Sequence, residues 1–375
     1  MTLVGGVEGS SAAGPASGRR IVDTFPFSEP HEVDLLLLKL RLEAPVVDAW
    51  VIVENSWSFQ GEDKGLFADA LIAGDDRFSP YRDRISVVTA QRPVIRFDEP
   101  ELAELAAFEV ERWQRDLATE RIRELARQEG WDPSSTWVLI TDVDEMLDGT
   151  DPSRVEALGR LLGEGGGVVR IPTRRYWFDF DNQFAPLMGI PIVQLADLDS
   201  EERSLGEVRR AGSGLLTTST EQVVAFEYTS CYPAESIFRK LSTQSHTGYS
   251  RADLDDALSC NHRPIASARG MRLRDSDLDL LERVELDAAN SPAHVREHLA
   301  ELRTGNVRAG YRERRARAHP WLGTRRNRVR ARMGEIRSQL RRKAIYAVRR
   351  AGWRQFGRSA PAEPPSPWRD RRHPP

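Results

Sequence analysis

The chain has 375 residues, enough for one large domain with appendages or for about two domains of ordinary size. Hydrophobic residues make up 40% and charged residues 30% of the chain, which excludes a disordered, collagen-like or repeat-only protein. Its two cysteines exclude a disulfide framework and a four-cysteine zinc site, and they favour a reducing compartment.

The formal net charge of −3 conceals a strong asymmetry along the chain. Residues 306–375 contain 21 Lys and Arg against four Asp and Glu, whereas residues 1–305 contain 33 against 53. This pattern is typical of an acidic folded body with a basic tail. The chain has no run of ~18 apolar residues, and residues 1–20 lack the charge and apolar block of a signal peptide. We therefore expect a disordered leader over 1–20 and a cytoplasmic protein.

Strand-like and helix-like segments alternate from residue 21 to about residue 171. Runs of β-formers or of apolar residues predict strands over 21–27, 46–53, 85–88, 137–140 and 168–171. Apolar residues at helical spacing predict helices over 33–42, 101–128 and 152–163. This alternation predicts an α/β domain over 21–305 around a mostly parallel sheet flanked by helices. After a less regular segment over 172–250, a helical pattern returns over 276–303.

The strand predicted over 137–140 runs directly into the sequence Thr-Asp-Val-Asp-Glu. In open α/β sheets, ligands bind beyond the carboxyl ends of the strands, which is where Glu54, Asp142 and Asp144 fall. Carboxylates at positions i and i+2 can both bind one Mg²⁺ or Mn²⁺, which can be shared with a bound diphosphate. The alternative is that the two aspartates cap a following helix. Four acidic residues within 142–148 favour the cation, because such crowding is costly without a balancing charge.

Five sequence blocks lie in order between residues 21 and 305: IVDTFPFSEPHEVDLLLLKLRL, VVDAWVIVENSWSFQGEDKGLF, ERWQRD, WVLITDVDEM and SIFRKLSTQSHTGY. Together they resemble glycosyltransferase family 17, whose best-known members are β-1,4-mannosyl-glycoprotein β-1,4-N-acetylglucosaminyltransferases. The resemblance implies a GT-A fold, inversion at the anomeric carbon, and Mn²⁺ or Mg²⁺ at the acidic motif. It also implies a nucleotide-sugar donor, with a UDP-sugar and N-acetylglucosamine favoured, and a glycan or lipid-linked acceptor.

The resemblance also implies roles for individual residues. Those matching its metal-binding positions are Asp142, Asp144 and His246. Those that it implies for donor binding are Thr24, Phe25, Glu54, Lys64, Arg115 and Asp142. For Glu54, Lys64 and Arg115 the alternative is a surface ion pair or a helix-face charge, and for His246 it is a structural role. Residues 226–234 depart from the family's glycine pair, so the identity of the sugar stays open.

Direct displacement by an acceptor hydroxyl needs one base on the face opposite the leaving group. Glu235 keeps the family's acidic position and is the first candidate, followed by Asp179 and Asp181. The two aspartates belong to the segment RRYWFDFDNQF, whose aromatic rings would either stack on a sugar or form a hydrophobic lid over the sheet.

The same acidic motif also resembles a motif of a second enzyme class. Residues 138–148 are similar to the first motif of haloacid-dehalogenase-type phosphatases, in which the first aspartate, here Asp142, is the nucleophile. That fold normally begins with this strand, whereas about 120 ordered residues precede it here. The later acidic pair would have to be Asp255-Asp256, in a helical rather than a strand-end context.

The C-terminal part predicts a basic helical extension over 306–360 and a disordered tail over 361–375. Between residues 325 and 356, apolar residues recur every three to four positions among arginines, the pattern of a basic amphipathic helix. Such a helix would bind an anionic membrane surface at the inner face of the membrane. Nucleic-acid binding is a less favoured alternative, and packing against the acidic body is a third.

Overall fold

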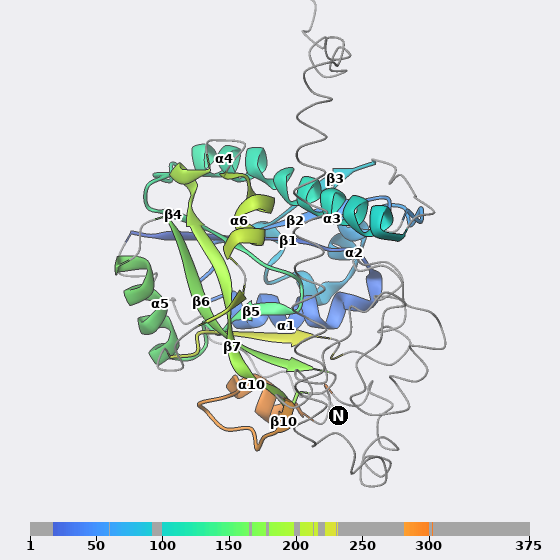
Figure 1. Ribbon diagram of the computed structural model, residues 1–375. Coiled ribbons are helices and arrows are strands. Elements are labelled where there is room, and N and C mark those ends of the chain that lie inside the picture. The colour runs from blue at the N-terminus through green and yellow to red at the C-terminus, as the bar shows by residue number, and fades with distance from the viewer. Residues whose placement is uncertain are drawn as a thin grey trace, which may run out of the picture. The chain divides into compact units, whose positions relative to one another are not determined.

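The computed structural model describes residues 18–59, 61–91, 100–164, 167–177, 180–198, 203–212, 214–216, 222–229, 231, 281–299 and 302. All of them belong to one compact unit. They form an α/β fold in which one curled, mixed sheet carries helices on both faces (Figure 1). The predicted fold class, α/β, is therefore confirmed. Among these residues, no helix is both long enough and apolar enough to cross a membrane.

The first half of the sheet is parallel and has the strand order β3-β2-β1-β4. Its strands are β1 (Arg20–Pro26), β2 (Ala49–Asn55), β3 (Ile85–Ala90) and β4 (Thr136–Ile140). The helices between them are α1 (Val33–Glu43), α2 (Ala68–Gly74), α3 (Pro100–Asp116) and α4 (Ala118–Gln128). β2 and β4 are buried along their whole lengths, as their nearly continuous apolar runs predict.

The second half of the sheet corrects the expectation of a mostly parallel sheet. β7 lies antiparallel to β4, β6, β8 and β10, and β5 lies antiparallel to β9. Among the described strands of this half, only β6 and β9 pair in parallel. Antiparallel pairing follows from the short connection between β6 and β7, because a parallel pair needs a crossover of a dozen or more residues. The strands are β5 (Glu145–Leu147), β6 (Val168–Trp177), β7 (Asn182–Gln194), β8 (Gly214–Leu215), β9 (Ala225–Thr229) and β10 (Leu281–Arg283).

Alternate side chains of the parallel strands enter two separate clusters of the core. On one face, Phe25 and Trp50 pack with residues of α1, α2 and α5 (Pro152–Glu164). On the other face, Val51 and Ile140 pack with residues of α4 and of α6, which is described below. Figure 1 shows this layering, with α3 and α4 on one side of the sheet and α1 and α5 on the other.

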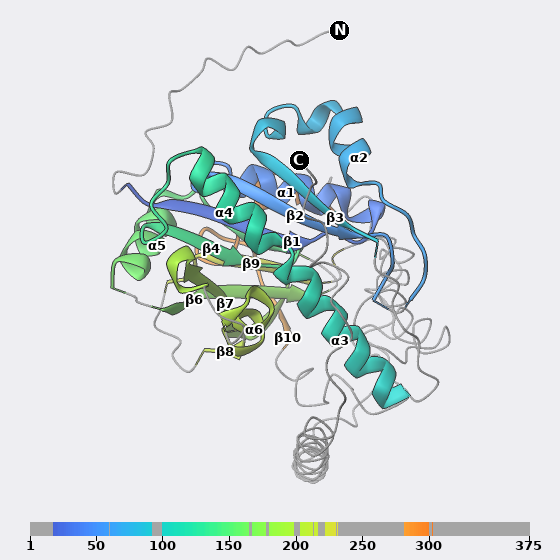
Figure 2. The same cartoon turned by 90° about the horizontal axis from the view of Figure 1, so that it is seen from above.

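Two helix predictions differ from the structure. The helix expected over 101–128 is divided into α3 and α4 at Leu117, whose amide donates to the Gln114 carbonyl three residues back. Such a tighter turn interrupts the regular helix, and Figure 2 shows the two parts following each other along the sheet. The described part of the helix expected over 276–303 instead contains β10 and the short α10 (Ala293–Glu297), because β10 pairs with β7. Residues 1–17 and 303–375, where the leader and the basic extension are expected, lie outside the described residues.

Candidate functional site

The acidic turn, residues 141–145, joins β4 to β5 at the edge where the parallel strands end. The Thr141 amide donates to the Thr24 carbonyl at 3.1 Å and so continues the ladder between β4 and β1. Two hydrogen bonds close the turn: Glu145 N to the Asp142 carbonyl at 3.0 Å, and Asp142 N to Glu145 Oε2 at 2.9 Å. This backbone leaves the Asp142 side chain 38% exposed and buries those of Asp144 and Glu145.

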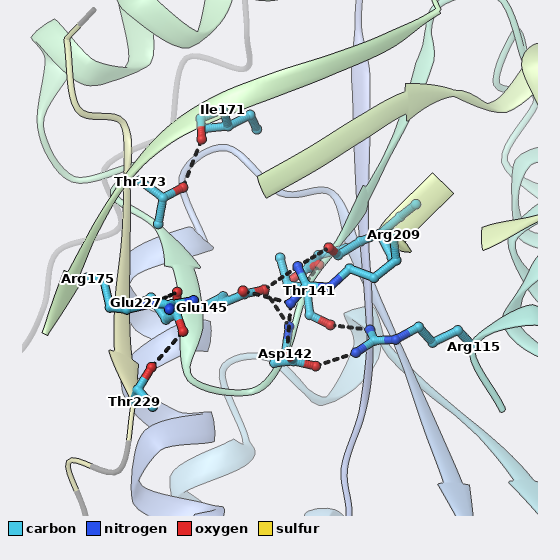
Figure 3. A network of polar contacts seen from close by, with 12 residues as sticks. Arg115, Thr141, Asp142, Glu145, Ile171, Thr173, Arg175, Arg209, Glu227 and Thr229 are labelled. Carbon is cyan, nitrogen blue, oxygen red and sulfur yellow. Dashed lines mark hydrogen bonds and ion pairs between the residues drawn. The ribbon is translucent and has the colours of Figure 1, made fainter. Parts of the chain in front are cut away.

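Two arginines from different helices contact the Asp142 carboxylate (Figure 3). Arg115 of α3 donates to Oδ1, and Arg209 of α6 (Leu205–Gly212) donates to Oδ2 at 2.8 Å. Arg115 is buried and also donates to the Thr141 carbonyl at 2.7 Å. Arg209 also reaches both carboxylate oxygens of Glu145, each at 2.7 Å. A third guanidinium, that of Arg154, pairs with Asp148, so the positive charge beside the crowded acids comes from three arginines.

Burial and charge shift the pKa values of these groups. Burial by itself would lower the pKa of Arg209, but Glu145 and Asp142 outweigh it and raise that pKa. The same balance, with Asp142 and Glu111, raises the pKa of Arg115. Burial raises the pKa of Glu145 to about 7, with Arg209 opposing the shift and Asp142 adding to it. Both arginines are therefore permanently charged groups beside the turn.

Glu227 on β9 is a further acidic residue of the site that the sequence interpretation did not single out. It lies opposite Glu145 in the antiparallel β5–β9 pair. Its carboxylate accepts hydrogen bonds from Arg175 Nε and from Thr229 Oγ1, both at 2.6 Å (Figure 3). The sequence did contain a signal for it, a single carboxylate between the aromatic residues Phe226 and Tyr228 of a buried strand. Since a buried charge requires a partner, this position indicates a polar contact.

The residues described around the turn do not by themselves fit a divalent-cation site. Both Asp142 oxygens accept from arginines, whose positive charge disfavours a cation at the same place. Asp144 is buried, and its carbonyl accepts from the Tyr228 amide at 2.8 Å. In the part of the chain that the structure describes, no group of three or more His, Cys, Asp or Glu side chains is placed to hold a metal ion. His246, the third ligand implied by the resemblance, lies outside that part.

Glu54 and Lys64 lie at the carboxyl end of β2 and form a buried pair instead of a surface pair. Glu54 accepts from the Phe67 amide at 2.9 Å and from the Ala68 amide at 3.1 Å, so its carboxylate caps the start of α2. Lys64 Nζ lies 3.7 Å from Glu54 Oε1. Burial lowers the pKa of Lys64, against the attraction of Glu54, Glu29 and Glu32. The contacts of Glu54 are accounted for by helix capping and by its pairing with Lys64.

Thr24 and Phe25 of β1 face the interior of the protein. The Thr24 hydroxyl donates to the Val51 carbonyl at 2.9 Å, and both side chains are almost completely buried. Phe25 belongs to the core cluster that packs against α1. Both side chains are therefore buried, and their contact with a donor stays a prediction.

The candidates for the catalytic base are only partly described. Asp181 lies just before β7, is largely buried, and its carbonyl accepts from the Val284 amide at 3.0 Å. Asp179 and Glu235 lie outside the described residues. Of the residues predicted for the site, the structure brings Asp142 and Arg115 into direct contact and adds Arg209, Glu145 and Glu227 to them.

Neither the protein-family models nor the curated proteins contain a match to this sequence.

Proposed function

We propose that the chain is a GT-A-type glycosyltransferase, similar to glycosyltransferase family 17, that moves a sugar with inversion from a nucleotide-sugar donor to a glycan or lipid-linked acceptor. The observation that carries the proposal is the position of the acidic turn, directly after β4 at the edge where parallel strands end. The five sequence blocks between residues 21 and 305 support it independently. A UDP-sugar is the proposed donor, with N-acetylglucosamine as the candidate sugar.

Arg115 and Arg209 supply groups that suit the diphosphate of such a donor. Guanidinium groups bind phosphate oxygens in bidentate geometry and stay charged at any relevant pH. Both groups now contact Asp142, so a diphosphate would compete with this carboxylate for them. Once the donor is bound, the two guanidinium groups would stabilise the negative charge that develops on the departing diphosphate.

The proposed reaction is a direct displacement. The acceptor oxygen forms its bond to the anomeric carbon while the bond from that carbon to the diphosphate oxygen breaks. A carboxylate takes the hydroxyl proton, and the nucleoside diphosphate leaves with the bonding electron pair. Glu235, Asp179 and Asp181 remain the candidate bases. Mn²⁺ or Mg²⁺ is proposed as a cofactor whose ligands would include groups beyond the described residues, such as His246 or the donor itself, and no step above depends on it.

The phosphatase alternative would use Asp142 as a nucleophile. Both of its oxygens accept hydrogen bonds from arginines, which withdraws electron density from the atom that would attack phosphorus. The three parallel strands that precede β4 also depart from a fold that begins with this strand. Both observations favour the transferase.

A thermal-shift screen tests the proposal. The chain is heated with UDP-N-acetylglucosamine, UDP-glucose, UDP-galactose or GDP-mannose, each with Mn²⁺ or with EDTA. A true donor should raise the melting temperature, because it binds only the folded state. A donor at about 100 times its Kd would add about 2.7 kcal/mol to the free energy of unfolding. The contrary outcome is no shift with any nucleotide sugar, together with hydrolysis of a simple phosphomonoester that disappears in Asp142→Asn.

A further inference from the structure

The ammonium group of Lys39 lies beneath the acidic turn, in the core. Lys39 belongs to α1, is completely buried, and has its Nζ 4.8 Å from the centre of the Phe25 ring. The Nζ atom lies 2.6 Å from Asp23 Oδ2 and 3.0 Å from Glu43 Oε1. Burial by itself would lower the pKa of Lys39, but the two carboxylates outweigh it and raise that pKa. The group is therefore charged, and we call Asp23, Lys39 and Glu43 the Lys39 cluster.

Lys39 contacts the acidic turn at both of its ends. Its Nζ donates to Thr141 Oγ1 at 3.0 Å, where the turn begins, and to the Glu145 carbonyl at 2.5 Å, where it ends. The Thr141 hydroxyl donates in turn to Asp23 Oδ1 at 2.7 Å. One side chain from α1 therefore fixes the distance between the two ends, and Asp142 lies between them.

Glu43 extends the same contacts to the strand after the turn. Its Oε1 accepts from the Leu147 amide of β5 at 3.1 Å, and its Oε2 accepts from Trp50 Nε1 of β2 at 2.9 Å. The Lys39 cluster thus connects β1, α1, β2 and β5 with Thr141 at the start of the turn. Arg115 and Arg209 contact the Asp142 side chain and the backbone carbonyls before it, and the Lys39 cluster contacts the Thr141 hydroxyl and the backbone of β5 after it.

Stability alone does not explain charged groups at this place. Burying an ion pair removes both charges from water, and apolar side chains of similar volume commonly give equal or greater stability. The neighbours Phe25, Leu36 and Leu40 show that apolar side chains already fill this part of the core. A requirement for one backbone geometry at the turn would explain the charges, since buried polar groups fix a unique arrangement in some proteins.

We propose that Lys39 is a positioning residue: it fixes the acidic turn, whose Thr141 carbonyl and carboxylates hold Arg115 and Arg209 in the geometry needed to bind the donor diphosphate. The inference rests on the proposed function, and it concerns a residue that would not itself touch the donor. A shift of about 1 Å in groups that position a substrate can lower rates about a hundredfold, so a group that fixes the turn would have a large indirect effect.

The test replaces the whole Lys39 cluster by uncharged residues of similar size. In the triple variant Asp23→Asn, Lys39→Met, Glu43→Gln no charge is left without a partner, so the protein should fold. Leu162→Ala, which opens a cavity beneath α5, is the matched control for a general loss of stability. Each protein is measured for its melting temperature, for the Kd of UDP with Mn²⁺, and for hydrogen exchange of the amides of Asp142 and Glu145.

We expect the triple variant to melt no lower than the control, to bind UDP about tenfold or more weakly than the parent, and to exchange the two amides faster. The control should keep the parent's UDP affinity. Unchanged UDP affinity and unchanged exchange in the triple variant would overturn the positioning role and leave the proposed function intact. Equal losses of UDP affinity in both variants would also overturn it. If the parent does not bind UDP, the proposed function fails, and with it the role in donor binding, whatever the exchange rates show.

Discussion

The carboxyl group of Glu43 makes the stability of the core sensitive to pH. Burial raises the pKa of Glu43 to about 8, Lys39 opposes the shift, and Asp23 adds to it. A carboxyl whose pKa is raised on folding stabilises the folded state at low pH, and this contribution is lost as the pH rises through the folded pKa. The free energy of unfolding should therefore fall as the pH rises from about 7 to about 9.

Glu43→Gln isolates this contribution. Glutamine keeps an acceptor for the Leu147 amide but has no proton to lose in this range. Urea unfolding of both proteins at several pH values should show a decline in the parent that is smaller in the variant. The interpretation is wrong if the two stability curves run parallel across that range.

Arg209 differs from its neighbour Arg210 in a way that tests the proposed donor site. Arg209 contacts Asp142 and Glu145, whereas Arg210 is 65% exposed and pairs with Glu207. Lysine keeps the charge of arginine but cannot form the bidentate contacts. We expect Arg209→Lys to weaken UDP binding about tenfold, or about 1.4 kcal/mol, and Arg210→Lys to leave it unchanged. Titration calorimetry with UDP and Mn²⁺ measures both, and equal affinities in the two variants would remove Arg209 from the donor contacts.

At the scale of elements, the contact between α6 and α3 determines where Arg209 lies. The Gly206 amide at the start of α6 donates to Asp116 Oδ1 at 2.8 Å. A Cβ at Gly206 would lie 2.8 Å from the Arg112 carbonyl oxygen, a backbone atom of α3 that cannot move aside easily. Only glycine allows the two helices to approach this closely, so residue 206 controls the position of the helix that carries Arg209.

Gly206→Ala should therefore move α6 away from α3 and destabilise the protein by about 1–3 kcal/mol. Gly159→Ala in α5 is the matched control, because a Cβ there would meet nothing within 4 Å. In a helix interior, alanine is more favourable than glycine by up to about 1 kcal/mol, so the control should be slightly more stable than the parent. Urea unfolding distinguishes the two variants, and stabilisation by both would show that the contact has no steric role.

Apart from α2, which was not predicted, the elements of the parallel half were predictable because they are encoded locally. Buried strands such as β2 and β4 are apolar runs in the sequence, and α1 has apolar residues at helical spacing. Both patterns can be recognised without knowledge of distant contacts. The antiparallel half was not predictable, because pairing between β7 and β4 depends on contacts far apart in the sequence. The division between α3 and α4 at Leu117 likewise depends on one hydrogen bond and leaves the apolar spacing almost unchanged.

In the candidate site, too, the local features were predictable and the contacts between distant residues were not. The carboxylates of the acidic turn follow from their position after a buried strand, and the structure places Arg115 against one of them. Arg209 lies 67 residues from Asp142 in the sequence, in a segment without a chemical pattern, so no local signal indicated their contact. Lys39 is one of four charged residues in the sequence of α1, and its complete burial became visible only in the folded protein.

At the scale of the whole molecule, the most prominent feature is the charge asymmetry between the acidic body and the basic C-terminal part. Acidic residues outnumber basic ones over 1–305, and the reverse holds over 306–375. We propose that residues 325–356 bind an anionic membrane surface, where each basic residue close to the surface contributes about 1 kcal/mol. Apolar residues spaced among these arginines add burial at the interface, which a purely electrostatic contact lacks. Membrane attachment would suit a transferase with a lipid-linked acceptor.

The test compares two variants that each lose five positive charges from the full chain. In one, glutamine replaces arginine within the amphipathic stretch, at Arg325, Arg326, Arg328, Arg330 and Arg332. In the matched control, glutamine replaces arginine before that stretch, at Arg308, Arg312, Arg314, Arg315 and Arg317. The parent should sediment with vesicles that contain phosphatidylglycerol but not with phosphatidylcholine vesicles, and less at higher salt, because counterions screen the attraction.

The first variant should lose at least about tenfold in vesicle affinity, since the removal of even two surface contacts of about 1 kcal/mol has that effect. The control should lose clearly less, because only charges next to the apolar stripe are brought to the lipid surface by its burial. Equal losses would mean that net charge alone drives the association and that the amphipathic pattern has no role. If the parent ignores both kinds of vesicle but binds DNA or RNA at the same salt concentration, nucleic-acid binding replaces membrane binding as the role of this segment.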